Sequence, residues 1–188
     1  KTAYEMLRSL VGSEMCIRDR ELIEAYWLFG IEADKIEVLI HPQSIIHSLV
    51  RFVDGAALAQ LGVADMRAPI AYALSVPAAR VANAAQRLDL AEVGKLEFLA
   101  VDPERFPALT LARRCLAAGG AAAAVLNAAN EEAVDAFLRG RLCFGAIVDL
   151  AQAALDVFSA RKAEEYDELR ALTVEVRRWA ASRIGGGD

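Results

Sequence analysis

Carboxylate and imidazole side chains occur close together in the first part of the sequence. Glu21 and Glu24 lie three residues apart, and His41 and His47 flank the segment His-Pro-Gln-Ser-Ile-Ile-His. Carboxylate oxygens suit Mg²⁺ or Mn²⁺, and histidine titrates near neutral pH. Two chemistries are therefore open for these residues, the binding of a divalent metal and the transfer of a proton.

Each of these residues also has a purely structural interpretation. Two histidines six residues apart match no standard zinc spacing, so surface positions or satisfied core positions stay open for both. Glu24 fits a solvated helix position equally well. Asn127 and Asn130 interrupt an alanine-rich helical pattern, where asparagine is unfavourable unless it caps a helix or bonds its neighbours. We interpret these two asparagines as holding a helix start or a helix–helix contact.

The acidic pair lies on a predicted helix, and the histidines lie at predicted strand ends. Residues 21–29 carry the helical apolar stripe and stop at Gly30, a favourable C-terminal glycine; the stripe is Leu22, Ala25, Tyr26 and Phe29. Residues 36–40 alternate as a short strand that a proline ends. His41 follows this strand and His47 begins the next, where alternation places His47 on the face of Leu49, Arg51 and Val53.

A hairpin follows. The β-rich runs 45–53 and 56–61 meet at Asp54-Gly55, a dipeptide whose tolerance of positive φ predicts a two-residue turn. Asp65 can then cap a helix that extends to about residue 74. Beyond this helix the periodicity lapses until about residue 102, except for an edge strand expected at residues 96–99.

From Pro107 onward every periodic segment is helical. Apolar stripes predict four amphipathic helices. In chain order, the first has the stripe Leu109, Ala112 and Leu116, the second spans residues 125–138, the third has Ile147, Leu150, Ala154 and Phe158, and the fourth has Tyr166, Leu169, Leu172, Val176 and Trp179. Short connections between such helices predict a bundle. The fold class is therefore α+β, with a β-hairpin unit followed by an all-α four-helix bundle.

Composition narrows the classes of function. The net charge of −5 and the pI near 5.2 leave no basic excess for nucleic acid. No run approaches the roughly 20 apolar residues of a membrane span. The three cysteines include no C-x-x-C pair, which favours a reducing cytosol, with Cys115 and Cys143 as apolar filler on helices.

Three ordered motifs resemble the 1-deoxy-D-xylulose 5-phosphate reductoisomerase family. They are Ile-Glu-Val-Leu-Ile-His-Pro-Gln-Ser-Ile-Ile-His at 36–47, Leu-Ala-Gln-Leu-Gly at 58–62 with Asp-Met-Arg-Ala-Pro-Ile at 65–70, and Leu-Asn-Ala-Ala-Asn-Glu at 126–131. The resemblance covers residues 21–188. It implies conversion of 1-deoxy-D-xylulose 5-phosphate to 2-C-methyl-D-erythritol 4-phosphate, in non-mevalonate isoprenoid biosynthesis, with NADPH and Mg²⁺ or Mn²⁺.

The family's architecture implies a division of the chain. Members carry an N-terminal dinucleotide-binding domain, a central catalytic domain and a C-terminal helical bundle. We therefore expect a partial catalytic domain at 21–75, a linker at 76–101 and the bundle at 102–188, with the NADPH domain missing. The resemblance also implies a homodimer in the full-length form and, by default, a bacterial cytoplasmic location.

The resemblance assigns roles to three residues. Glu21 aligns with the glutamate of the family's Asn-Lys-Gly-Leu-Glu helix, which implies a catalytic residue that binds both the metal and the substrate. His47 should face the phosphorylated substrate, and Met66 should help to cover it. Neither of these two is an expected metal ligand.

The sequence departs from the family just before Glu21. Ile17-Arg-Asp-Arg20 replaces Asn-Lys-Gly-Leu, which removes two expected substrate contacts, and residues 9–20 resemble a translated sequencing adapter. We expect residues 1–20 to be non-native. Because the other acidic metal ligands belong to the missing part, we expect this chain alone to be inactive. The alternative from a different class is a stand-alone helical interaction module without catalysis.

Overall fold

The computed structural model describes residues 20–185, and the predictions for residues 1–19, Cys16 included, lie outside this range. The chain divides into two compact units. One comprises the described residues up to Glu37 together with those from Asp102 onward, and the other is Val38–Val101.

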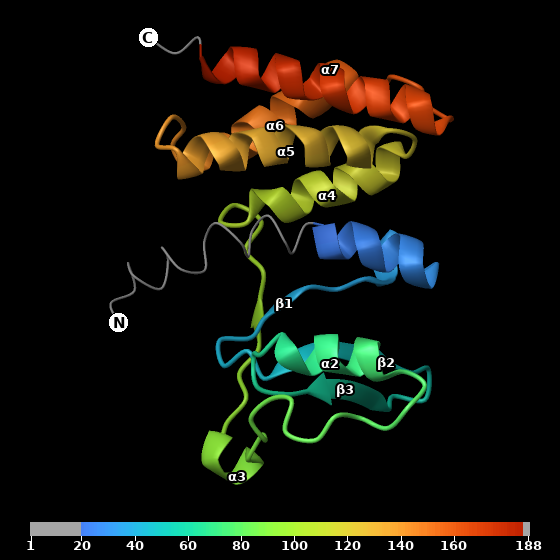
Figure 1. Cartoon of the computed structure of the whole chain (residues 1–188), viewed down its shortest axis with the longest axis vertical. Helices are drawn as coiled ribbons and strands as arrows, with labels where there is room; N and C mark the ends of the chain where they lie inside the picture. The colour runs from blue at the N-terminus through green and yellow to red at the C-terminus, as the bar shows by residue number, and fades with distance from the viewer. Residues whose placement is uncertain (1–19, 186–188) are drawn as a thin grey trace. The chain divides into compact units, whose positions relative to one another are not determined.

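The first unit is a helical bundle centred on α5 (Figure 1). This helix contacts three others, and the four are α4 (Pro107–Ala118), α5 (Ala122–Leu138), α6 (Gly145–Phe158) and α7 (Tyr166–Ile184). A helix at residues 20–29 and the 3₁₀ turn η1 (Ala33–Lys35) belong to the same unit. The predicted four-helix bundle is confirmed.

Small residues on α5 explain its central position. Five of its alanines are at most 1% exposed, so neighbouring helices approach its backbone closely; they are Ala122, Ala128, Ala129, Ala133 and Ala136. Larger side chains from the surrounding helices complete the core, including Leu155, Phe158, Leu172 and Val176. The bundle therefore buries apolar surface through close helix contact more than through bulky side chains on its central helix.

Three details of the bundle differ from the predictions. The buried residues of α4 are Ala108, Leu111, Ala112 and Cys115, whereas the predicted Leu109 and Leu116 are only half-buried. This helix has two overlapping apolar stripes, and its packing against the neighbouring helices decides which one faces inward. Tyr166 begins α7 and is 76% exposed. Cys143 is exposed in the connection between α5 and α6, whereas Cys115 is buried as predicted.

The second unit holds two small antiparallel sheets. β1 (Leu39–Ile40) pairs with β4 (Leu99–Ala100), and β2 (Ile46–Arg51) pairs with β3 (Ala57–Leu61). The predicted strand at 36–40 is thus shortened to its last two residues. The predicted edge strand at 96–99 is replaced by the two-residue β4, which overlaps it only at Leu99. The helices α2 (Arg67–Ser75) and α3 (Leu90–Val93) complete the unit.

The hairpin is confirmed, but its turn is not the predicted two-residue turn. Phe52 donates its N–H to the carbonyl of Ala56, which leaves a three-residue loop at 53–55. Asp54 uses its carboxylate to accept from the N–H of Ala56, and Gly55 takes a φ of +89°. The side-chain bond of Asp54 stabilises the longer loop, while the left-handed glycine closes it.

Within residues 20–185, no helix has both the length and the apolar character required to cross a membrane.

Candidate active-site elements

Glu21 lies near the start of the described part of the helix at residues 20–29, which packs on the helical bundle. Leu22 is 2% exposed, and Ile23 contacts the bundle core. Glu21 is half-buried beside them, whereas Glu24 is exposed. Gly30 has a φ of +62° and ends the helix as predicted.

The predicted apolar stripe of this helix is only partly correct. Leu22 is buried and Ala25 and Tyr26 are half-buried, but Phe29 is 73% exposed. Ile23, which the stripe left out, takes part in the contact with the bundle. The side of the helix that faces inward is thus rotated toward Ile23, because the bundle covers the first turns more than the last.

His47 occupies a β-bulge in the hairpin. Ile46 pairs with Leu61 and Ser48 pairs with Gln60, so His47 is the extra residue between two regular pairs. Its Nε2 atom lies 3.1 Å from the carbonyl oxygen of Gly62. The regular alternation on which the predicted face of His47 rested is therefore interrupted at this residue, because a bulge inserts one residue between regular pairs.

His41 joins the end of β1 to the segment before β4. Its Nδ1 atom lies 2.7 Å from the carbonyl oxygen of Glu97, and its ring stacks on Phe98 with centroids 4.7 Å apart. Because a carbonyl only accepts, Nδ1 carries the proton. The Nε2 atom is buried without a hydrogen-bond partner among the described residues.

Gln43 and Glu97 form a reciprocal clamp in the same unit. The Gln43 side chain donates to the Glu97 carboxylate over 2.9 Å and accepts from the Glu97 backbone N–H over 3.1 Å. Lys95 donates to the same carboxylate, and these hydrogen bonds hold the pKa of Glu97 below its usual value. Together with His41, the clamp fixes the turn that leads into the His47 bulge.

Met66 lies at the start of α2 and is 70% exposed. Its two neighbours in the chain are joined by hydrogen bonds. The Oδ1 atom of Asp65 accepts from the backbone N–H of Arg67 at 2.9 Å and from its side-chain Nε at 3.0 Å. These bonds lower the pKa of Asp65. Asp65 accepts from the N–H of Arg67, the first residue of α2, but it is not the N-cap of the helix as predicted, because that position is Met66.

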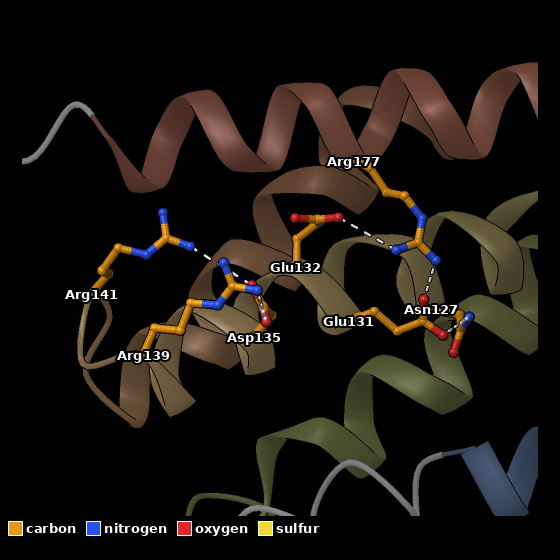
Figure 2. Close-up of polar contacts among 7 residues, drawn as sticks. All are labelled: Asn127, Glu131, Glu132, Asp135, Arg139, Arg141 and Arg177. Atoms are coloured by element: carbon orange, nitrogen blue, oxygen red, sulfur yellow. Dashed lines mark hydrogen bonds and ion pairs between the residues drawn. The ribbon is translucent and has the colours of Figure 1, made fainter.

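A polar cluster joins α5 to α7 in the bundle (Figure 2). Arg177 of α7 donates to Glu131 and to Glu132 of α5, and Asn127 donates to Glu131 over 3.1 Å. Burial acts to lower the pKa of Arg177, but the hydrogen bonds and charges of the two glutamates outweigh it and raise the pKa. Figure 2 also shows Asp135, which forms exposed ion pairs with Arg139 and with Arg141.

This cluster decides between the two interpretations of the asparagines. Both lie inside α5, which begins at Ala122, so they do not hold a helix start. Asn127 belongs to a helix–helix network through Glu131, and Asn130 is only 6% exposed. The role of Arg177 was not found from the sequence, because no local pattern links residue 177 to residues 131 and 132.

The described residues do not by themselves make a metal site. None of their histidine, cysteine, aspartate and glutamate side chains form a group of three or more that could hold an ion. Glu21 offers carboxylate oxygen, the donor that Mg²⁺ prefers, but one carboxylate falls short of the six oxygens that this ion takes. Further ligands from outside the described residues would be needed to complete a magnesium site around Glu21.

The structure places the three predicted site residues in different surroundings. His47 and Met66 belong to the same compact unit, and the His47 ring contacts Gly62, four residues before Met66. Glu21 belongs to the other unit.

Comparison with known proteins gives a consistent set of matches. A family model described as the DXP reductoisomerase C-terminal domain matches residues 61–179. A curated 1-deoxy-D-xylulose 5-phosphate reductoisomerase from Burkholderia multivorans is 49% identical over 176 residues, which are 94% of this chain and 44% of that protein. A relative with the same name from Rhodospirillum centenum is 46% identical over 179 residues, 95% of this chain and 44% of its own length.

Solved structures agree with these relatives. The Zymomonas mobilis reductoisomerase in complex with NADPH matches with a TM-score of 0.84 and 42% identity, over 92% of this chain and 46% of that one. A DOX-P reductoisomerase in complex with NADPH, fosmidomycin and magnesium matches with a TM-score of 0.85 and 39% identity, over 93% and 45%. This chain thus spans less than half the length of the proteins that it matches.

Proposed function

Because the chain belongs to the 1-deoxy-D-xylulose 5-phosphate reductoisomerase family, we propose that its residues serve the NADPH-dependent conversion of 1-deoxy-D-xylulose 5-phosphate to 2-C-methyl-D-erythritol 4-phosphate. One observation carries the proposal. Nearly the whole chain superposes, at a TM-score of 0.85, on a reductoisomerase that holds NADPH, fosmidomycin and magnesium. Both compact units therefore have counterparts in a protein that binds the expected cofactors.

We propose that Glu21 contributes one carboxylate to a site for Mg²⁺ or Mn²⁺. The half-buried position of Glu21 on a helix anchored by Leu22 supports a fixed carboxylate. A divalent cation, when bound, would hold the oxygens of the substrate and stabilise negative charge on them during the rearrangement. The remaining ligands and the NADPH-binding residues would come from the part of the relatives that this chain does not span.

His47 and Met66 have complementary proposed roles. His47, whose Nε2 is held by the Gly62 carbonyl, would accept a hydrogen bond from the phosphorylated substrate through Nδ1. Its place at a bulge supports this role because bulges are common beside active sites. Met66, exposed between the paired Asp65 and Arg67, would cover the substrate and exclude water. Glu21 would contact the substrate as well as the metal.

We propose that the full-length enzyme is a homodimer in a bacterial cytoplasm. In this chain, residues 21–75 would be part of the catalytic domain, 76–101 a linker and 102–188 a supporting bundle, while residues 1–20 would be foreign to the enzyme. The matches to curated bacterial enzymes support the setting. The alternative of a stand-alone helical interaction module has no comparable support, because the family match at residues 61–179 extends over parts of both units.

A hybrid protein tests the function. In this hybrid enzyme, residues 21–188 follow the N-terminal part of the Burkholderia multivorans relative, which is 49% identical to the chain in the shared region. We expect the hybrid enzyme to oxidise NADPH with 1-deoxy-D-xylulose 5-phosphate when Mg²⁺ is present, and the 188-residue chain alone to show no turnover. A folded hybrid enzyme that binds NADPH but does not turn over would contradict the proposal.

A further inference from the structure

We propose that Arg113, a residue of the bundle, is a positioning residue for Glu21. Arg113 lies on α4 and is exposed. Its Nη1 donates to the carbonyl oxygen of Ala33 over 2.8 Å, and its Nη2 donates to the carbonyl oxygen of Ile36 over 2.7 Å. One guanidinium therefore holds two backbone acceptors that lie 80 and 77 residues away in the sequence.

The two carbonyls belong to the segment that directly follows the Glu21 helix. The helix ends at Gly30, and η1 occupies Ala33–Lys35. Ala33 begins η1 and Ile36 follows its last residue. Each carbonyl oxygen has two lone pairs, so a planar cation with two parallel donors suits the pair. The fork of Arg113 thus fixes both the position and the direction of this segment.

The opposite end of the Glu21 helix is fixed by apolar contact. Leu22 is 2% exposed, and Ile23 packs against the bundle core. These contacts set the rotation of the helix about its axis, but burial is non-directional and resists sliding or tilting less than directed hydrogen bonds do. Arg113 supplies that second constraint, so the bundle contacts both the helix, through Leu22 and Ile23, and the segment that follows it, through Arg113.

Arg113 is suited to this task because it has little other function in the bundle. Among the described residues its hydrogen bonds go only to these two carbonyls. The buried face of α4 is made by other side chains, namely Ala108, Leu111, Ala112 and Cys115. Loss of the guanidinium should therefore loosen the segment at 20–36 without opening the core.

The consequence for catalysis rests on the function proposed above. If Glu21 is a ligand and substrate contact, small displacements of its helix change the fit to the reacting groups, and misplacement by about 1 Å can cost on the order of a hundredfold in rate. NADPH affinity should not depend on Arg113, because the proposed NADPH site lies in the part that this chain does not span. Arg113 acts through Glu21 and does not itself touch the substrate.

Amide hydrogen exchange on the 188-residue chain tests the anchoring directly. We expect Arg113→Ala to speed exchange of the amides at 20–36 about tenfold or more while those of α5 to α7 stay unchanged. Arg113→Lys should give an intermediate rate, because one ammonium does not reproduce the guanidinium fork. Arg114→Ala is the matched control, since the neighbouring arginine on α4 pairs instead with Asp156 of α6.

Steady-state kinetics of the hybrid enzyme tests the consequence. We expect Arg113→Ala to lower kcat about tenfold and to raise the Mg²⁺ concentration needed for half-maximal rate, with the KM for NADPH unchanged. Arg113→Lys should restore part of kcat, and Arg114→Ala should leave all three values near those of the parent. A uniform loss of active protein would instead lower kcat with no change in the Mg²⁺ requirement.

The outcomes separate the inference from the proposed function. Unchanged exchange at 20–36 in Arg113→Ala, or equal acceleration in Arg114→Ala, would overturn the anchoring. Faster exchange with unchanged kinetics in an active hybrid enzyme would overturn the positioning of Glu21. If Glu21→Gln leaves the active hybrid enzyme unaffected, the proposed role of Glu21 fails and the positioning role fails with it, while the exchange result still reports the anchor.

Discussion

The Nε2 atom of His47 lies 3.1 Å from the carbonyl oxygen of Gly62, at the point where the hairpin carries its bulge. A carbonyl only accepts, so Nε2 carries the proton of a neutral His47 ring. The Gly62 N–H in turn donates to the carbonyl of Ile45. The orientation of the histidine is therefore coupled to the end of the hairpin pairing.

Replacement of His47 should weaken substrate binding more than it slows turnover. In the hybrid enzyme we expect His47→Ala to raise the KM for 1-deoxy-D-xylulose 5-phosphate about tenfold, which corresponds to one lost hydrogen bond of about 1.4 kcal/mol. His47→Gln, which keeps one donor and one acceptor, should lose less. A KM unchanged in both variants would remove His47 from the substrate site.

Replacement of Glu21 should abolish most of the metal-dependent turnover. Glu21→Gln keeps the size of the side chain but removes the anionic ligand, so we expect kcat of the hybrid enzyme to fall by about a hundredfold or more. Glu24→Gln is the matched control, because Glu24 lies on the same helix and is exposed. Near-normal kinetics of Glu21→Gln would count against the role of Glu21.

Acidification should break the Asp65–Arg67 pair beside Met66. The pKa of Asp65 is lowered by the hydrogen bonds and charge of Arg67, so the pair stabilises the folded chain above the ordinary aspartate pKa. That contribution is lost as pH falls through the lowered pKa of the folded state. NMR titration should show a lower Asp65 pKa in the parent chain than in Arg67→Ala. Equal pKa values would show that the pair does not persist in solution.

Truncation of a core leucine should destabilise the bundle strongly. Leu155 is 1% exposed in the contact between helices, so we expect Leu155→Ala to lower the free energy of unfolding by about 3 kcal/mol. Leu138→Ala is the control, because Leu138 is 74% exposed and its truncation should cost less than about 0.5 kcal/mol. Urea unfolding of the chain measures both. Similar losses in the two variants would contradict the packing described for α6.

Local sequence patterns determined much of the architecture. The glycine at residue 30 ended its helix, apolar periodicity predicted the four helices of the bundle, and Asp54-Gly55 predicted a hairpin. The three ordered motifs led to the family that the comparisons then showed. These signals survive in sequence because periodicity and turn chemistry depend on residues only a few positions apart.

Only the tertiary structure decided which side chains meet. The bulge at His47, the inward face of the helix at 20–29 and the grip of Arg113 on the carbonyls of Ala33 and Ile36 leave no local pattern. A one-residue register shift reverses the side-chain alternation along a strand, and a guanidinium can hold any backbone carbonyl that folding brings near it. The sequence by itself thus determined the elements and the family, whereas packing decided how Glu21 and His47 are held.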